Sequence, residues 1–476
     1  MAIDTHLERE IKFAVGPTFE LPDLRNVTGR SVRKARQSFR TAYFDTSDLR
    51  LWSRGITLRH RSRINDGPGT WTLKLPEAQG GATLDRQEIS WRAPKDEVPA
   101  AAHELLRGLI RRTGLDQVVE MATTRIPWSL RDHSGNEVAE LDDDDVTVVG
   151  GPQDGVHYRQ VEIELTSDRP DDQAVAAIAQ ALRRAGAEPD DQAKLGKALG
   201  LSTDRREQPA AKALRNATGA DVVRYAVCGG LERLLDHDYR LRLHSDDPHD
   251  HDVHQARVAT RRLRSNLKTL RPLLDPIWLK HTEDELRWLG TILGAVRDAD
   301  VMRASLRSTG NTELRVPGWD SLAELRTKLA AERVNAVAAL GEALGSPRYL
   351  DLLDRLHAAT SQPPLISGSG NGPGCLPASK LMPKLVRRRW RKMEKKVAAA
   401  GKSPSAEELH RIRIAAKNLR YACELSQPVM GKPAKKTAKL AEDVQTVLGN
   451  YHDASASIDW LTEVGTTGPG RGGFAA

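Results

Sequence analysis

Cysteine is scarce in this chain of 476 residues, which contains three: Cys228, Cys375 and Cys423. They lie far apart and form no CxxC or CxxH pair, so neither a disulfide framework nor a structural zinc site is expected. No window approaches the roughly eighteen consecutive apolar residues of a membrane span. The first residues also lack the basic start and apolar run of a signal peptide. These absences predict a cytoplasmic protein with no membrane partner.

Aromatic residues are also few, at 4% of the chain. Base stacking needs exposed aromatic side chains, and no DNA- or RNA-reading motif is present, so the sequence argues against a nucleic-acid partner. Charge is abundant but unevenly divided. Residues 1–200 hold 28 Lys and Arg against 32 Asp and Glu, whereas residues 201–476 hold 44 against 32. This asymmetry indicates an acidic half that could hold cations and a basic half suited to an anionic polymer.

The pattern of apolar residues changes along the chain from short alternating segments to long Ala/Leu/Arg-rich stretches. We therefore predict an α+β protein, with an antiparallel β-barrel domain over 1–201 and an all-α domain over 214–465. Residues 202–213 are expected to be a linker and 466–476 a disordered tail. The segment 361–380 is rich in Pro, Gly and Ser, which predicts a flexible insert within the helical domain.

The helical half contains an internal repeat. VHQARVATRRLR begins at Val253 and LHRIRIAAKNLR at Leu409, and each is followed by a second shared element, LGAVRDAD from Leu293 and LGNYHDAS from Leu448. Two matches at nearly one offset indicate a duplicated helical unit. The two repeats are expected at about 214–305 and 380–465.

Charged and apolar side chains alternate along each predicted strand of the first domain. In the opening strand Glu8, Glu10 and Lys12 share one face, opposite Ile11 and Phe13. One such strand would be an ordinary solvated sheet face. Seven strands with charges of both signs instead predict a barrel with a charged lumen and an apolar outside covered by helices. The same alternation puts Arg59, Arg61, Lys74, Arg86, Arg125, Asp142, Glu162 and Glu164 on charged faces.

Such a lumen has a definite chemistry. Clustered carboxylates repel one another unless a cation lies between them, and oxygen ligands suit Mg²⁺ or Mn²⁺. Arginine and lysine opposite them would hold a multiply charged phosphate chain. The spacing supports phosphate binding more firmly than hydrolysis.

The Glu8-x-Glu10-x-Lys12 pattern resembles the ExExK signature of the CYTH domain, the triphosphate tunnel metalloenzyme superfamily. YFDTSDLRLWSRGITLRHR, WTLKLP, RQEISW, TTRIPW, ELDDDDV, VEIEL and AKLGKAL follow in that family's order, over about residues 1–200. The resemblance implies metal ligands at Glu8, Glu10, Asp142, Glu162 and Glu164, with Glu8, Glu10 and Lys12 as the catalytic set. It implies triphosphate contacts from Lys12, Arg59, Arg61, Lys74, Arg86, Arg125 and Lys194. The heavy acidic run 142–145 leaves open which of its members acts.

A basic stripe follows each repeat helix of the second half. In the first repeat His254, Arg257, Arg261, Arg264, Lys268 and Arg271 recur at spacings of 3 and 4. The second repeat keeps this geometry with His410, Arg413, Lys417 and Arg420. Compensating acids are nearly absent from this face of the sequence, so an external anion is the expected counterion.

These duplicated helices resemble the CHAD domain, over about residues 215–465. The resemblance implies binding of inorganic polyphosphate by His254, Arg257, Arg261, Arg264, His410, Arg413, Lys417 and Arg420. The second copy departs from the first at Asn418, which replaces Arg262, and at His452, which replaces Arg297. The two repeats are therefore expected to contribute unequally.

Together the two halves predict a Mg²⁺- or Mn²⁺-dependent triphosphatase that hydrolyses inorganic triphosphate, with a helical domain that binds polyphosphate. The expected partners are these two anions, and association with polyphosphate granules is a further expectation. Two alternatives stay open. One is a non-catalytic polyphosphate-binding protein, and the other is an adenylate cyclase or nucleoside triphosphatase that uses ATP.

Overall fold

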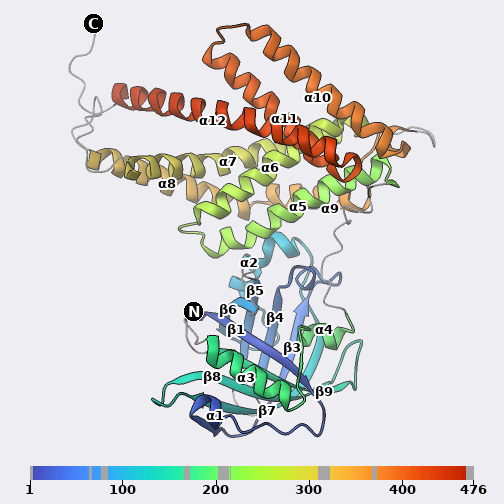
Figure 1. Cartoon of the computed structure of the whole chain (residues 1–476), viewed down its shortest axis with the longest axis vertical. Helices are drawn as coiled ribbons and strands as arrows, with labels where there is room; N and C mark the ends of the chain where they lie inside the picture. Colours follow the sequence, from blue (N-terminus) through green and yellow to red (C-terminus); the bar gives the residue numbers. More distant parts are fainter. Residues whose placement is uncertain are drawn as a thin grey trace. The chain divides into compact units, whose positions relative to one another are not determined.

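The computed structural model of the chain divides into two compact units, residues 1–207 and 208–476 (Figure 1). The described residues are 4–63, 67–76, 84–165, 172–201, 214, 216–308, 322–366 and 372–467. The first unit is built on an antiparallel sheet and the second is helical, so the predicted fold class is confirmed. The predicted linker 202–213 and nearly all of the predicted tail lie outside the described residues.

Ten antiparallel strands form the first unit. They are β1 (Asp4–Val15), β2 (Arg30–Arg33), β3 (Gln37–Asp45), β4 (Thr57–Arg63), β5 (Thr70–Pro76), β6 (Leu84–Arg92), β7 (Asp116–Arg131), β8 (Glu137–Val148), β9 (His157–Leu165) and β10 (Glu188–Pro189). Their order is β10-β1-β6-β5-β4-β3-β7-β8-β9, and β2 pairs with β7. Strand β1 pairs with β6 through residues 4–10 and with β9 through residues 10–15. The strands therefore wrap into a tunnel-like fold with one charged face inside.

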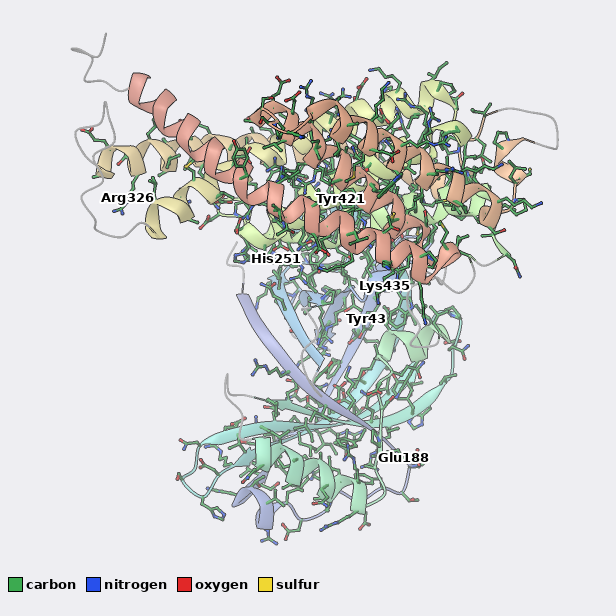
Figure 2. The ribbon with its side chains drawn as sticks, turned by 45° about the horizontal axis from the view of Figure 1, so that its top comes forward. Tyr43, Glu188, His251, Arg326, Tyr421 and Lys435 are labelled. Atoms are coloured by element: carbon green, nitrogen blue, oxygen red, sulfur yellow. The ribbon has the colours of Figure 1, made fainter. Side chains whose placement is uncertain are left out.

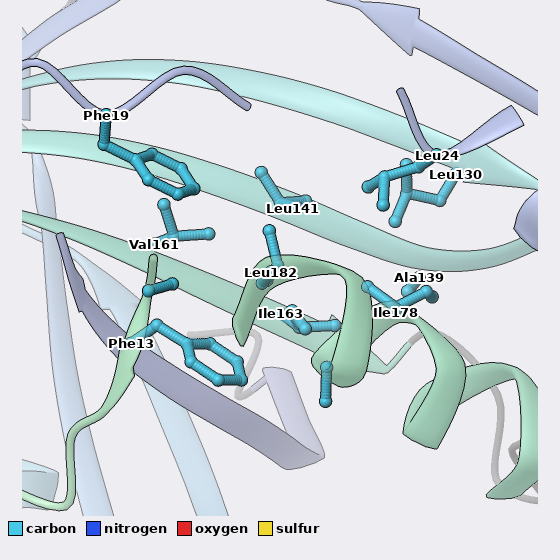
Figure 3. Close-up of a cluster of buried hydrophobic side chains, with 12 residues drawn as sticks. Phe13, Phe19, Leu24, Leu130, Ala139, Leu141, Val161, Ile163, Ile178 and Leu182 are labelled. Carbon is cyan, nitrogen blue, oxygen red and sulfur yellow. The ribbon is translucent and has the colours of Figure 1, made fainter. Parts of the chain in front are cut away.

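The outer face of the sheet is apolar and is covered by helix α3 (Asp172–Arg184). Ile178 and Leu182 of α3 pack against Phe13, Leu141 and Ile163, which come from β1, β8 and β9 (Figure 3). All five side chains are fully buried. The alternation of the strands thus separates an apolar outside from a charged inside, as the sequence predicts.

Helix α4 (Lys194–Leu199) covers a second apolar cluster, which includes Tyr43 and Trp52. A methyl group added at Gly196 would lie 2.6 Å from the Trp52 ring, so only glycine permits this close approach. The tight packing fixes the first residue of α4, Lys194, beside the charged inside of the sheet. The remaining short elements are α1 (Arg25–Thr28), η1 (Trp52–Arg54) and α2 (Ala100–Ile110).

The helices of the second unit are α5 (Gly219–Leu243), α6 (Asp250–Leu270), α7 (Pro276–Ser308), α8 (Leu322–Gly345), α9 (Pro347–Ser361), α10 (Ala378–Ala400), α11 (Ala406–Met430) and α12 (Lys432–Thr467). Helices α5, α6 and α7 pack in succession, α10, α11 and α12 repeat that arrangement, and α11 packs on α6. A methyl group added at Gly294 would lie 3.6 Å from the Arg257 guanidinium, and one at Gly449 would lie 3.5 Å from that of Arg413. The glycine of the shared LG element therefore occupies the same position in both repeats, beside an arginine.

The described parts of the predicted insert 361–380 pack on the helices. Leu365 forms a β-bridge with Leu274, and Pro377 forms one with Thr218. A short turn, η4 (Pro373–Cys375), follows, and α10 begins at residue 378, inside the predicted insert. Residues 367–371 lie outside the described part. None of the described helices combines the length and apolar content that crossing a bilayer requires.

Replacing Leu182 by alanine should lower the free energy of unfolding of the first unit by about 2–5 kcal/mol, because it leaves a cavity under α3. Thermal or urea unfolding would measure the loss, and the fluorescence of Trp128, which packs against this cluster, would report it. The control is Arg184→Ala on the exposed side of the same helix, where a change of only about 0.5 kcal/mol is expected. Equal effects of the two substitutions would contradict the assignment of this core.

Candidate functional site

Strand register gathers the predicted carboxylates on one wall of the tunnel. Glu10 of β1 lies directly opposite Glu164 of β9, and Lys12 lies opposite Glu162. On the other edge of β9, Glu162 lies opposite Asp142 of β8. Residues directly opposite in antiparallel strands have Cβ atoms about 4.5–5.5 Å apart. Residues from three distant segments therefore become neighbours on one face.

The charged side chains converge on a pocket of about 450 Å³. Its lining is Glu10, Lys12, Tyr43, Thr57, Arg59, Arg61, Lys74, Arg125, Glu162, Glu164, Ala193, Lys194 and Leu195. Nine of these thirteen residues are ones that the sequence singled out. Glu8 and Arg86 lie opposite each other on β1 and β6, and their side chains are outside the described part. Asp142 lies beside the pocket, in contact with Arg125.

Arg61 of β4 is a half-buried cation that lines the pocket. Its guanidinium stacks over the Phe39 ring at 4.3 Å from the centroid. Among the described residues Arg61 forms no ion pair, and its buried Nε donates no hydrogen bond. Burial, together with the charges of Arg59 and Arg125, lowers the pKa of Arg61 to about 10. A cation held partly out of water without a counterion is costly, so this position favours an anion.

The neighbouring strands supply cations that are partly neutralised. Lys74 of β5 lies opposite Glu88 of β6 and contacts its carboxylate. Arg59 Nη2 lies 3.6 Å from the same Glu88 carboxylate. Glu88 is buried, so both contacts are largely shielded from bulk water. It is therefore a positioning carboxylate for this wall.

On the opposite wall, Arg125 and Lys194 hold a buried carboxylate pair. Arg125 donates from Nε and Nη2 to both oxygens of Asp144, each at 2.7 Å. Lys194 Nζ lies 2.6 Å from both Asp144 Oδ2 and Glu162 Oε2. Burial alone would raise the pKa values of these two carboxyls. Their cationic neighbours outweigh burial and hold the pKa of Asp144 below its usual value and that of Glu162 well below.

Asp144 is the functional residue that the sequence reasoning missed. The sequence singled out Asp142 and left the choice within the acidic run 142–145 open. Alternation along β8 puts residues 140, 142 and 144 on one face, so the signal was present. The structure adds the reason for its importance: Asp144 is fully buried and links Arg125 to Lys194.

Asp142 has the opposite electrostatic character. Burial, together with Asp144, Glu164 and Glu162, outweighs its contact with Arg125 and raises its pKa to about 7. Its Oδ1 atom is buried and accepts no hydrogen bond from the described residues. Closely placed carboxyls that resist ionisation are a recognised setting for a bound cation, which relieves their repulsion.

The donor set fits a hard divalent cation. All the candidate ligands are carboxylate oxygens, with no thiol or imidazole among the pocket residues, and this composition suits Mg²⁺ or Mn²⁺. Within the described part of the chain, no three such side chains converge in ligating positions. Lysines and arginine neutralise them instead, as in the 2.8 Å pair of Lys12 and Glu10. These residue types therefore suit a divalent metal ion. In this structure, internal ion pairs determine the orientations of their side chains.

In the helical unit, the two basic stripes meet around Lys417 of α11. Burial and the charges of Arg261, Arg413, Arg264 and Arg257 lower the pKa of Lys417 to about 7. Arg257, Arg261 and Arg264 of α6 thus face α11, as the stripe predicts. All eight predicted polyphosphate contacts, including His254 and His410, are half-buried.

The expectation that this face lacks compensating acids is wrong in part. Arg257 Nη1 donates to Asp298 of α7 at 2.8 Å, and Arg420 lies 3.0 Å from Glu442 of α12. These acids come from other helices, so the periodicity of α6 and α11 could not reveal them. Arg420 also lies 5.0 Å from the ring of Tyr421, which stands among the helices (Figure 2). Arg420 is therefore the least available of the predicted contacts.

Comparison with known proteins identifies a domain family in each half of the chain. The CYTH domain family matches residues 6–194, and the CHAD domain family matches residues 225–462. "Uncharacterized protein MT2285" and "Uncharacterized protein Rv2226", from two strains of Mycobacterium tuberculosis, are each 30% identical over 495 residues, which cover 96% of this chain and 88% of theirs. The chain therefore belongs to the family of proteins that join an N-terminal CYTH domain to a C-terminal CHAD domain.

Solved structures are similar to each half. The CHAD domain from the plant Ricinus communis is 27% identical and covers 54% of this chain and 82% of its own, with a TM-score of 0.43. PptA from Streptomyces chartreusis is 21% identical and covers 54% and 89%, with a TM-score of 0.41. HpAC1 from Hippeastrum, a candidate adenylyl cyclase with a dominant triphosphatase activity, is 16% identical and covers 40% and 93%, with a TM-score of 0.28.

Replacing Lys417 by methionine should stabilise the helical unit at low pH and remove part of its pH dependence. In the folded chain the pKa of Lys417 is about 7, whereas its ordinary value is 10.5. Between these two pH values Lys417 is protonated in the unfolded chain and has lost its proton in the folded chain. Stability therefore rises with pH in that window, and the variant lacks this rise.

Melting temperatures from about pH 6 to about pH 9 would measure the effect, with the advantage of the variant largest at the acid end. Lys436→Met, at an exposed lysine of α12, is the control. A difference between wild type and Lys417→Met that stays constant with pH would contradict the assignment.

Proposed function

We propose that the CYTH domain is a metal-dependent triphosphatase that hydrolyses inorganic triphosphate, and that the CHAD domain binds inorganic polyphosphate. The observation that carries the proposal is the tunnel pocket, in which cations outnumber carboxylates. Its lining includes Lys12, Arg59, Arg61, Lys74, Arg125 and Lys194, against Glu10, Glu162 and Glu164. A chain of phosphates is the ligand that such a set would neutralise.

The same lining favours inorganic triphosphate over a nucleotide. Its apolar members are Ala193 and Leu195, and Tyr43 is the aromatic residue among them. The Tyr43 ring is buried in the cluster under α4, so it offers no free face for a base. A purine ring would therefore gain little from this pocket, whereas three linked phosphates would meet a cation on each wall.

The internal ion pairs suggest how substrate and metal would enter together. Lys12 and Lys194 now neutralise Glu10, Asp144 and Glu162. If a divalent cation takes over that neutralisation, the lysines become free to bind phosphate oxygens. Glu10, Glu162 and Glu164, with Glu8 and Asp142, are the carboxylates that would hold the cation. Bound there, Mg²⁺ or Mn²⁺ supplies Lewis-acid stabilisation of charge on the phosphoryl group.

The cationic residues of the pocket would bind and orient the substrate. Arg61, Arg59 and Lys74 bind and orient the phosphate chain from one wall, and Arg125 and Lys194 bind it from the other. Arg61 contributes most per contact, because its half-buried charge has no counterion among the described residues. Arg86 is expected to join this set on the strength of its place on β6, opposite Glu8.

The CHAD domain would hold long polyphosphate on the surface around Lys417. Arg257, Arg261 and Arg264 from one repeat and Arg413 from the other surround this lysine. Binding of a polyanion would restore the proton that Lys417 loses in the folded chain. The proposal thus includes a cytoplasmic protein that stores or recruits polyphosphate and cleaves triphosphate.

Replacing Glu10 and Glu164 together by glutamine should reduce phosphate release from inorganic triphosphate by about 100-fold or more, because neutral amides cannot hold the metal and its charge. Release would be measured with Mg²⁺ or Mn²⁺, in parallel on inorganic triphosphate, ATP and long-chain polyphosphate. Glu188→Gln, at an exposed carboxylate of β10 (Figure 2), is the matched control and should keep full activity.

The three substrates separate the proposal from its rivals. Release from ATP with none from inorganic triphosphate would instead identify a nucleotide enzyme. Polyphosphate binding by the wild-type protein with no release from any substrate would identify a non-catalytic binding protein.

Arg61→Met should weaken triphosphate binding by about tenfold or more while raising the melting temperature of the CYTH domain, because it removes a half-buried charge that lacks a counterion among the described residues. Calorimetric titration with triphosphate, together with thermal unfolding, would measure the two effects. Arg63→Met, at an exposed arginine of the same strand, should leave triphosphate binding unchanged. Loss of stability together with loss of binding would show that Arg61 has a structural role instead.

A further inference from the structure

Helix α10 carries a continuous basic face that is separate from the residues around Lys417. It consists of Lys384, Arg387, Arg388, Arg391, Lys392 and Lys395, whose spacings of 3 and 1 put them on one side of the helix. All six side chains are exposed, and they line a shallow hollow of about 950 Å³. None forms an ion pair with the described residues. Like charges in adjacent turns destabilise a helix, so this face favours an external anion.

Duplication does not account for this face. His254 and His410 fix the offset between the repeats at 156 residues. At that offset, the positions of the basic face correspond in α5 to Cys228, Leu231, Glu232, Leu235, Asp236 and Tyr239. None is basic, and Leu231, Leu235 and Tyr239 are buried in a helix that packs against α9. This side of the helix is thus exposed and basic in α10 of the second repeat, whereas the corresponding side of α5 is buried in the first repeat.

Positive charge continues from the stripe on α6 to this face. Arg389 of α10 donates from Nε to Thr269 Oγ1, at the end of α6, at 3.1 Å. Burial, together with Arg389, Arg388 and Arg271, lowers the pKa of Lys392. One carboxylate stands at this junction, Glu283, whose Oε2 lies 3.7 Å from Arg271. The two basic surfaces are therefore linked through the last turn of α6.

We infer that the α10 face is an extension of the polyphosphate site, which binds the part of a long chain that runs beyond the stripe on α6. This inference rests on the proposed function of the CHAD domain. The stripe from Arg257 to Arg271 is about 21 Å long, and the face from Lys384 to Lys395 adds about 16 Å. A linear, flexible polyanion can follow both, whereas single-stranded nucleic acid would also use stacking. The one aromatic residue of α10, Trp390, is not part of the basic face.

The experiment compares three variants of the full chain by calorimetric titration with polyphosphate of two lengths. The short chain is no longer than the stripe on α6, and the long one spans both surfaces. The first variant, Arg388→Glu/Arg391→Glu/Lys395→Glu, reverses the α10 face. The second, Lys402→Glu/Lys435→Glu/Lys436→Glu, makes the same change in net charge at exposed lysines outside α10. The third, Arg257→Ala/Arg413→Ala, alters the site around Lys417.

Reversal of the α10 face should weaken binding of the long chain about tenfold and leave the short chain unaffected. The second variant should leave both unchanged, and the third should weaken both. Equal loss in the first two variants would overturn the inference, because net charge alone would then explain it. Loss of single-stranded DNA binding with long polyphosphate unaffected would also overturn it. If the wild-type protein binds no polyphosphate, the proposed function itself fails.

Discussion

The arrangement of both domains depends on positive charge held partly out of bulk water, with too few counterions among the described residues. In the CYTH domain Arg61 is half-buried against Phe39 without a carboxylate partner in that part of the chain. In the CHAD domain four arginines and burial bring the pKa of Lys417 down to about 7. Each site is costly in the folded chain, because like charges repel and their hydration is lost. A phosphate chain is a ligand that would offset that cost, which connects two unrelated folds to one class of anion.

Ion pairs inside the CYTH tunnel neutralise other charged side chains of the site. Asp144 and Glu162 are neutralised by Arg125 and Lys194, and these contacts link the neighbouring strands β7, β8 and β9 to the first residue of α4. A bound metal ion and phosphate would have to replace these internal contacts. The ion pairs are therefore the state from which ligand binding begins. A site built this way keeps most of its charges paired when substrate is absent, with Arg61 as an exception among the described residues. That property explains how nine charged residues can line one pocket of a folded domain.

The CHAD domain shows how a duplicated unit acquires an asymmetric surface. Gly294 and Gly449 keep equivalent positions against Arg257 and Arg413, so the packing of each repeat is preserved. The outer side of the first helix has diverged, since α5 is covered by α9 and α10 is exposed and basic. Asn418, which replaces the arginine of the first repeat, accepts a hydrogen bond from Ser265 at 3.0 Å and so joins the repeats. Departures from the repeat pattern thus occur where the repeats contact each other or their surroundings.

Periodicity and motif order in the sequence were enough to predict the α+β class, the charged lumen, the internal repeat and most residues of the pocket. These features depend on local rules, because strand alternation and helical spacing fix which side chains share a face. Partners between elements depended on tertiary structure. Register brings Asp142 opposite Glu162 and Arg125 opposite Asp144, and the packing of α4 then adds Lys194. Asp298 of α7, beside Arg257, and Glu442 of α12, beside Arg420, lie outside the two helices, so no pattern within α6 or α11 could reveal them. Glu424, one turn after Arg420 in α11, is the acid that helical spacing does indicate. Likewise, the helix that packs beside a basic face decides whether that face is covered or exposed. The sequence of a single helix does not show which helix will pack there.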